Sequence, residues 1–134
     1  MRYLAIDYGT KRTGLAVCDQ SETIVSPLCV IEGRKNLVEK ILEIITRENI
    51  EAIIFGLPFN MDGTTGSQAK TTTRFAEELK KRTNIPVYFQ DERLSSFSAE
   101  EKLAPAEFTR KKKAKRLDAI AAAQILESFL EQKK

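Results

Sequence analysis

The sequence predicts an α/β domain built on a mixed five-stranded sheet, with three antiparallel strands, two parallel strands and flanking helices. Three short apolar segments, separated by turn residues, occupy the first 31 residues and predict an antiparallel meander. Two further apolar segments, at 51–58 and 85–90, alternate with stretches of helical periodicity and predict parallel strands. The length of 134 residues, 42% of them hydrophobic, fits one domain over 1–134.

The first predicted strand ends at a carboxylate. Residues 3–6 are apolar, Asp7 follows them, and residues 8–12 form a turn before a second apolar strand at 14–18. A carboxylate at the end of a buried strand needs a positive partner, so we interpret Asp7 as pointing into a metal site. The alternative is that Asp7 only accepts hydrogen bonds from amides of the turn.

The middle of the chain predicts two helices between strands. Residues 24–31 predict a third strand, which Pro27 places at a sheet edge or at a bulge because proline cannot donate to a ladder. Residues 36–49 have helical periodicity, with Asn36 as a candidate cap. A continuously apolar strand at 51–58, a helix at 68–83 and a last strand at 85–90 follow.

The final helix is predicted from about 113 to 131, after a short helix at 99–103 and a break at Pro105. Alanines surround Asp118 on this helix, and their small side chains would let the helix approach the sheet closely enough for Asp118 to reach Asp7. The residues predicted to face inward are Leu117, Ile120, Ala121, Gln124, Ile125 and Phe129. The order of elements, βββαβαβα, is the layout of a ribonuclease H-like domain.

Composition excludes several chemistries. The chain contains no histidine, which removes Ser-His-Asp and Cys-His catalysis and the common zinc sites. The two cysteines, Cys18 and Cys29, are interpreted as reduced thiols. No apolar run reaches the ~20 residues of a membrane span and no secretory signal is visible, so we expect a cytoplasmic protein with no membrane partner.

Three acidic positions stand out by their context. Asp7 ends the first strand, Asp91 and Glu92 end the last, and Asp118 lies in the final helix. Converging carboxylates without histidine suit Mg²⁺ or Mn²⁺, in a site for two ions roughly 4 Å apart that would hydrolyse phosphodiester bonds.

The residues leave alternatives open at two of these positions. The pattern does not separate Asp91 from Glu92 as the ligand, and Asp91 could instead pair with Arg93. Asp118 could pair with Lys115 or Lys111 on the helix surface.

Positive charge is concentrated near the start of the final helix. Removing the run at 110–116 takes six from the 22 basic residues and leaves 16 against 19 acidic residues. Such local charge suits a polyanion, although a solvated helix start is the alternative. The residues predicted to contact nucleic acid are Lys11, Arg12, Asn60, Arg93, Arg110, Lys111, Lys112, Lys113, Lys115 and Arg116.

Four ordered motifs resemble those of the YqgF/RuvX family. They are DYGTKRTGLA from Asp7, GLPFNMDG from Gly56, DERLS from Asp91 and KRLDAIAA from Lys115. The resemblance implies a ribonuclease H-like nuclease of the bacterial cytoplasm, described both as a Holliday-junction resolvase and as a nuclease that matures the 5′ end of the small-subunit ribosomal RNA precursor. It also implies that Asp7, Glu92 and Asp118 are the metal ligands.

One departure concerns the segment after the fourth strand. Better-known resolvases of this fold carry an acid there, whereas Leu57-Pro58-Phe59-Asn60 has none. Either Glu92 takes over the role from the adjacent strand, or the site lacks one acid.

The leading hypothesis is therefore a metal-dependent endonuclease acting on structured nucleic acid, with 5′-end processing of pre-16S rRNA as its function. One alternative is a Holliday junction resolvase on branched DNA, which would need a homodimer to cut paired strands. Another is a nucleic-acid-binding module without catalysis. The hairpin after Asp7 also resembles the phosphate-binding hairpin of sugar kinases, but those proteins pair two such domains.

Overall fold

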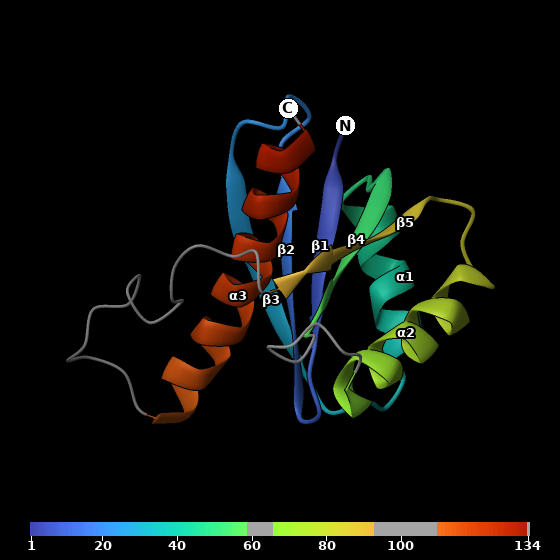
Figure 1. The fold of residues 1–134 in the computed structure, drawn as a ribbon, viewed down its shortest axis with the longest axis vertical. Helices are drawn as coiled ribbons and strands as arrows, with labels where there is room; N and C mark the ends of the chain where they lie inside the picture. The colour runs from blue at the N-terminus through green and yellow to red at the C-terminus, as the bar shows by residue number, and fades with distance from the viewer. Residues whose placement is uncertain (59–65, 93–109, 134) are drawn as a thin grey trace.

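The structure is a computed structural model that describes residues 1–58, 66–92 and 110–133, and for 110–116 only the backbone is described. Eight elements make up the fold (Figure 1). In chain order they are β1 (Tyr3–Tyr8), β2 (Arg12–Cys18), β3 (Val25–Glu32), α1 (Leu37–Arg47), β4 (Ala52–Leu57), α2 (Ser67–Lys80), β5 (Val87–Asp91) and α3 (Arg110–Lys133). The predicted short helix at 99–103 lies outside the described residues.

The five strands form one mixed sheet in the order β3-β2-β1-β4-β5. Strands β1, β2 and β3 pair antiparallel, whereas β4 pairs parallel with both β1 and β5. Both expectations for Pro27 are confirmed, since β3 is an edge strand and its register with β2 shifts between Leu15 and Ala16, next to Pro27. The predicted sheet of three antiparallel and two parallel strands is therefore correct.

Helices cover the two faces of the sheet unequally (Figure 1). Helices α1 and α2 pack on one face, where Ile6, Leu15 and Phe55 are fully buried beneath them. Among the described elements, helix α3 covers the other face, where it packs against Ala5, Ala16 and Ile54. Because strand residues alternate between faces, Asp7 belongs to the face of α3 and Tyr8 to the face of α1 and α2.

Helix α3 lies unusually close to β2. A Cβ atom built on Gly14 would overlap the carbonyl oxygen of Asp118 and crowd the amide of Ala119. The alanines predicted to allow this approach do so, since Ala119, Ala122 and Ala123 are buried. Glycine in the interior of a strand marks this kind of close backbone contact.

The predicted inner stripe of the final helix is only partly right. Gln124 and Ile125 are buried as expected, but Ala119, Ala122, Ala123, Leu126 and Leu130 form the rest of the buried face. The other predicted members, Leu117, Ile120, Ala121 and Phe129, are only partly buried. The buried face is rotated because the helix meets Gly14 through the backbone of Asp118 and Ala119, and this contact sets which side of α3 faces the sheet.

The cap predicted for the first helix is also different from expectation. Asn36 stands at the N-cap position of α1, but its backbone is left-handed, with φ of 57°, and its side chain makes no capping hydrogen bond. Asparagine tolerates this conformation better than most residues, which explains its presence there.

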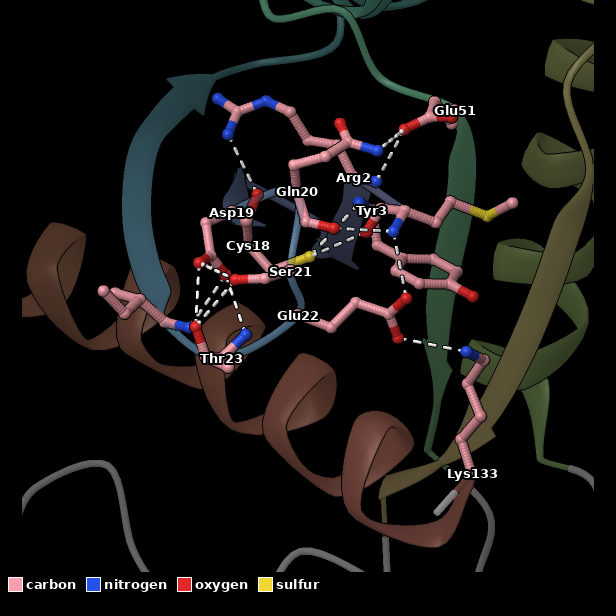
Figure 2. A network of polar contacts seen from close by, with 12 residues as sticks. Arg2, Tyr3, Cys18, Asp19, Gln20, Ser21, Glu22, Thr23, Glu51 and Lys133 are labelled. Carbon is pink, nitrogen blue, oxygen red and sulfur yellow. Dashed lines mark hydrogen bonds and ion pairs between the residues drawn. The ribbon is translucent and has the colours of Figure 1, made fainter.

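A polar network closes the far end of the sheet, opposite the end that carries Asp7 (Figure 2). Asp19 accepts hydrogen bonds from the amides of Ile24 and Thr23 at 2.9 and 2.8 Å and from the hydroxyl of Ser21 at 2.6 Å, which hold its pKa well below the ordinary value. Glu22 accepts from Lys133 at 3.0 Å. The network joins the β2–β3 turn to the end of α3.

Among the residues that the structure describes, no helix is both long and apolar enough to cross a membrane.

Replacing Gly14 by alanine should destabilise the fold strongly, because the added methyl group meets backbone atoms of α3 that cannot rotate away. Overpacking of this kind costs about 1–3 kcal/mol or more. Thermal and urea unfolding of Gly14→Ala should show a lower melting temperature and midpoint. An unchanged midpoint would mean that α3 does not contact β2 through its backbone.

Candidate functional site

Three acidic side chains come from three different elements at one end of the sheet. Asp7 lies near the carboxyl end of β1, and Glu92 follows directly after β5. Asp118 lies on α3, where its backbone contacts Gly14, the residue paired with Asp7 across the β1–β2 ladder. The close approach of α3 is therefore what carries Asp118 to the neighbourhood of Asp7.

The carboxyl groups of Asp7 and Glu92 are joined by a hydrogen bond. Burial raises the pKa of Glu92 to about 8, and the charge of Asp7 adds to the rise. Burial also raises the pKa of Asp7; the hydrogen bond with Glu92 opposes this rise and the charge of Asp118 adds to it. In metal-free protein at neutral pH, Glu92 is thus the protonated partner that donates to the Asp7 carboxylate.

The position of Glu92 depends on a glycine in the neighbouring strand. A Cβ atom on Gly56 of β4 would stand 3.0 Å from both Cγ and Oε1 of Glu92 and would also meet Ile125 of α3. The carboxyl group of Glu92 therefore lies over the end of β4, beside Asp7 on β1. This arrangement favours the view that Glu92 supplies the acid that is missing after the fourth strand.

Asp91 and Glu92 differ in orientation. Asp91 is the last residue of β5, paired with Leu57, and it affects Glu92 through its charge. Glu92 alone of the two makes the hydrogen bond with Asp7. The structure thus brings Glu92 into contact with Asp7, and the sequence pattern could not distinguish Glu92 from Asp91 in this respect. We call Asp7 and Glu92, with Asp118 nearby, the carboxyl cluster.

Asp118 is held by Arg12, the first residue of β2 after the β1–β2 turn. Nε of Arg12 donates to Oδ2 of Asp118 at 2.7 Å, with both side chains about one third exposed. Arg12 therefore compensates the charge of Asp118 in this state, in place of the substrate phosphate expected for it. Lys11 and Gly9 line the same small cavity of about 170 Å³ beside this pair.

The chemistry of this donor set suits a hard cation. Carboxylate oxygens are the ligands that Mg²⁺ and Mn²⁺ prefer, and two buried carboxyl groups in contact are a costly arrangement that a divalent ion would relieve. Within residues 1–58, 66–92 and 117–133, no three acidic or cysteine side chains already stand close enough to hold an ion. Asp7 and Glu92 are together, whereas Asp118 is engaged by Arg12.

Several predicted contact residues lie outside what the structure describes. Asn60 and Arg93 belong to the segments that are left out. The backbone of the basic run begins α3, but its side chains, Arg110, Lys111, Lys112, Lys113, Lys115 and Arg116, are not described.

The features that sequence reasoning missed are two glycines and one ion pair. Gly14 and Gly56 lie inside strands, where glycine is disfavoured unless another group approaches closely, and this signal could have identified them. The Arg12–Asp118 pair joins residues 106 positions apart, which no local pattern reveals.

Comparisons with known proteins agree with this architecture. The family model for RuvX, described as Holliday junction resolvase, matches residues 1–132. A protein of Maridesulfovibrio salexigens named "Putative pre-16S rRNA nuclease" is 39% identical over 132 residues, covering 97% of this chain and 98% of that protein. A protein of Ruegeria sp. with the same name is 38% identical over 130 residues, covering 96% and 83%.

Two solved structures have the same fold. T. thermophilus RuvC in complex with a Holliday junction substrate matches with a TM-score of 0.62 and 15% identity, covering 100% of this chain and 97% of that one. The Fowlpox virus resolvase bound to Holliday junction DNA matches with a TM-score of 0.60 and 16% identity, covering 99% of each chain. These matches confirm the predicted ribonuclease H-like fold.

The raised pKa of Glu92 predicts that metal-free protein loses stability as the pH rises. In the unfolded chain this carboxyl has its ordinary pKa of 4.5, whereas in the fold it keeps its proton to about 8. The contribution of Glu92 to the free energy of unfolding is therefore fully present below about pH 4.5 and is lost progressively as the pH rises through about 8. Melting temperatures in chelator should fall across this window, and Glu92→Gln should flatten the fall. The exposed Glu43→Gln is the control; equal slopes for Glu92→Gln and parent would contradict the buried pair.

Proposed function

Because the chain belongs to the RuvX family, we propose that it is a metal-dependent endonuclease that hydrolyses phosphodiester bonds of structured nucleic acid. The role that we propose is 5′-end processing of pre-16S rRNA in the bacterial cytoplasm. The name of the 39% identical relative supports a nuclease acting on pre-16S rRNA. The observation that carries the proposal is the buried Asp7–Glu92 carboxyl pair with Asp118 beside it.

Under this proposal Asp7, Glu92 and Asp118 are the catalytic carboxylates and would hold Mg²⁺ or Mn²⁺ in a two-metal site, with Asp91 near enough to influence Glu92. When bound, the ions would supply Lewis acidity at phosphorus and lower the pKa of the attacking water. Binding requires that Glu92 give up its proton and that Arg12 release Asp118.

The basic side chains have a matching role. Arg12, once released from Asp118, lies where it can contact a phosphate near the scissile bond, and Lys11 lines the same cavity. We propose that Asn60, Arg93 and the basic run over 110–116 contact the nucleic acid as well, since they follow β4, β5 or begin α3 in the chain.

The second candidate function is resolution of four-way DNA junctions, which the family description favours. A resolvase must cut two strands symmetrically, so this function requires a homodimer that presents two sites. A nucleic-acid-binding module without catalysis is the third candidate, and metal dependence separates it from the other two.

Replacing Asp7 by asparagine should abolish cleavage, with a loss of at least about a hundredfold, because the variant lacks a carboxylate at the centre of the cluster. Binding of nucleic acid should persist. The measurement is cleavage of a pre-16S rRNA fragment and of a four-way DNA junction, side by side, with Mg²⁺, with Mn²⁺ and with chelator.

Asp19→Asn, in the polar network at the far end of the sheet, is the matched control and should cleave like the parent. Cutting of the junction but not of the RNA would favour the resolvase function. If Asp7→Asn cleaves as fast as the parent, the assignment of this site is wrong.

Gly56→Ala tests the placement of Glu92. The three atoms nearest to the added methyl group belong to the side chains of Glu92 and Ile125, which can move, so the variant should fold with a loss of about 1–3 kcal/mol. Displacing Glu92 should reduce cleavage at least tenfold. Asp19→Ala, which loses hydrogen bonds far from the site, is the control for lowered stability alone. Full activity of Gly56→Ala would contradict the role of Glu92.

A further inference from the structure

A second pocket lies at the same end of the sheet as Asp7, but on the opposite face. Tyr8 follows Asp7 in β1 and points to the face of α1 and α2, where its ring stacks on Phe75 with centroids 4.4 Å apart and planes 11° apart. The guanidinium carbon of Arg34 lies 4.7 Å from the centroid of the Tyr8 ring. Tyr8 itself is only 8% exposed, whereas Arg34 is exposed and Phe75 is partly buried.

Arg34 is held in a defined orientation. Its Nη2 atom donates to the carbonyl oxygen of Gly9 at 3.1 Å, in the turn between β1 and β2. The stack on Tyr8 fixes the plane of the guanidinium, and a cation on an aromatic ring is favourable in its own right. A guanidinium oriented before binding loses less entropy when it grips a ligand.

A cavity of about 260 Å³ opens beside this arginine. Its lining consists of Tyr8, Arg34, Thr71, Arg74, Phe75 and Glu78. A neighbouring cavity of about 370 Å³ shares four of these residues and extends along the start of α1. The hydroxyl of Thr71 is committed to the carbonyl of Ser67, so the two arginines are the main donors facing the cavity.

The charges of the pocket favour an anion. Among the described residues that line the cavity, Glu78 is the one acid beside Arg34 and Arg74, and Glu39 of the neighbouring cavity is paired with Arg82. In the described part of the chain, neither Arg34 nor Arg74 is in an ion pair. Two guanidinium groups that line one cavity suit a phosphate chemically, since phosphate oxygens accept paired N–H donors.

The same turn connects this pocket with the carboxyl cluster. Arg12 reaches from the turn to Asp118 on the face of α3, while Arg34 holds the carbonyl of Gly9 on the other face. A nucleic-acid strand with its scissile phosphate at Asp7 could therefore cross the turn, past Lys11, and place a later phosphate between Arg34 and Arg74.

We propose that the pocket of Tyr8, Arg34, Arg74 and Phe75 binds a backbone phosphate of the substrate strand, away from the scissile bond. This inference rests on the proposed nuclease function and extends it with an anchoring site on the opposite face of the sheet. Because phosphates are common to RNA and DNA, the pocket adds affinity and alignment without reading sequence.

The test measures binding of labelled RNA stems and four-way DNA junctions by Asp7→Asn protein, which cannot cleave them. Adding Arg74→Ala should weaken binding about three- to tenfold near 0.1 M salt and reduce the slope of log K against log salt by about one. Lys80→Ala removes one charge from the same helix outside the pocket and is the matched control. Glu78→Gln should tighten binding, since it removes the opposing charge.

The outcomes separate the two proposals. Suppose that Arg74→Ala and Arg34→Ala both keep the parent's affinity and salt slope, while nucleic-acid binding and Asp7-dependent cleavage remain intact. This result would overturn the phosphate-binding role of the pocket and would leave the nuclease function standing. Equal losses in Arg74→Ala and Lys80→Ala would also overturn it, because they would indicate a general effect of charge. Failure of the parent protein to bind either nucleic acid would overturn the nuclease function and the pocket with it.

Discussion

The backbone contact between α3 and β2 is the constraint on which the rest of the candidate site depends. Gly14 leaves no side chain between the strand and the carbonyl of Asp118, so the helix settles directly on the sheet. The alanines on its buried face make the same approach continuous along the helix. A helix kept farther from the sheet by a side chain at position 14 would hold Asp118 farther from Asp7. Close packing, rather than the identity of the acid, is thus what turns Asp118 from a surface residue into a neighbour of the carboxyl pair.

The electrostatics of the cluster follow from burial. Two carboxyl groups that contact each other inside a protein cannot both ionise at low cost. In the metal-free protein, this cost raises the pKa of Glu92, which burial raises further. Arg12 resolves the corresponding problem at Asp118, which is more exposed, with an ion pair of 2.7 Å. A proton on Glu92 therefore limits the negative charge of the Asp7–Glu92 pair, and Arg12 compensates the negative charge of Asp118. Such a conflict has no benefit for folding, since apolar residues of similar size would usually be at least as stable, and this favours a functional reason for the acids.

The sequence predicts most of the fold because each element carries its own local signal. Alternating and continuous apolar runs located all five strands, and Pro27 identified the edge. The ends of β1 and β5 marked Asp7 and the Asp91-Glu92 pair. The sequence could not tell which of Asp91 and Glu92 contacts Asp7. That depends on how the chain leaves β5 and on the space above Gly56 in another strand. The buried face of α3 was also mispredicted, because apolar residues occupy every position from 119 to 126 except Gln124 and the pattern alone does not fix which side is buried. The backbone contact of Asp118 and Ala119 with Gly14 fixes it instead. The ion pair between Arg12 and Asp118 could not be predicted either, because it depends on the tertiary contact between two elements that are distant in the sequence.

The β1–β2 turn connects these separate observations into one functional arrangement. Consecutive residues of β1 point to opposite faces, so Asp7 enters the carboxyl cluster beneath α3 while Tyr8 supports Arg34 beside α2. After this turn, Arg12 reaches Asp118 on the face of α3. The carbonyl of Gly9 in the turn accepts a hydrogen bond from Arg34 on the other face. A hairpin of this kind places carboxyl groups on one side of a narrow edge and arginines on both sides, and the cleavage chemistry that we propose lies on one side only. A polymer long enough to cross the edge could contact both sides at once, whereas a mononucleotide could not, and this difference favours a strand of nucleic acid over a small phosphate ester as the substrate.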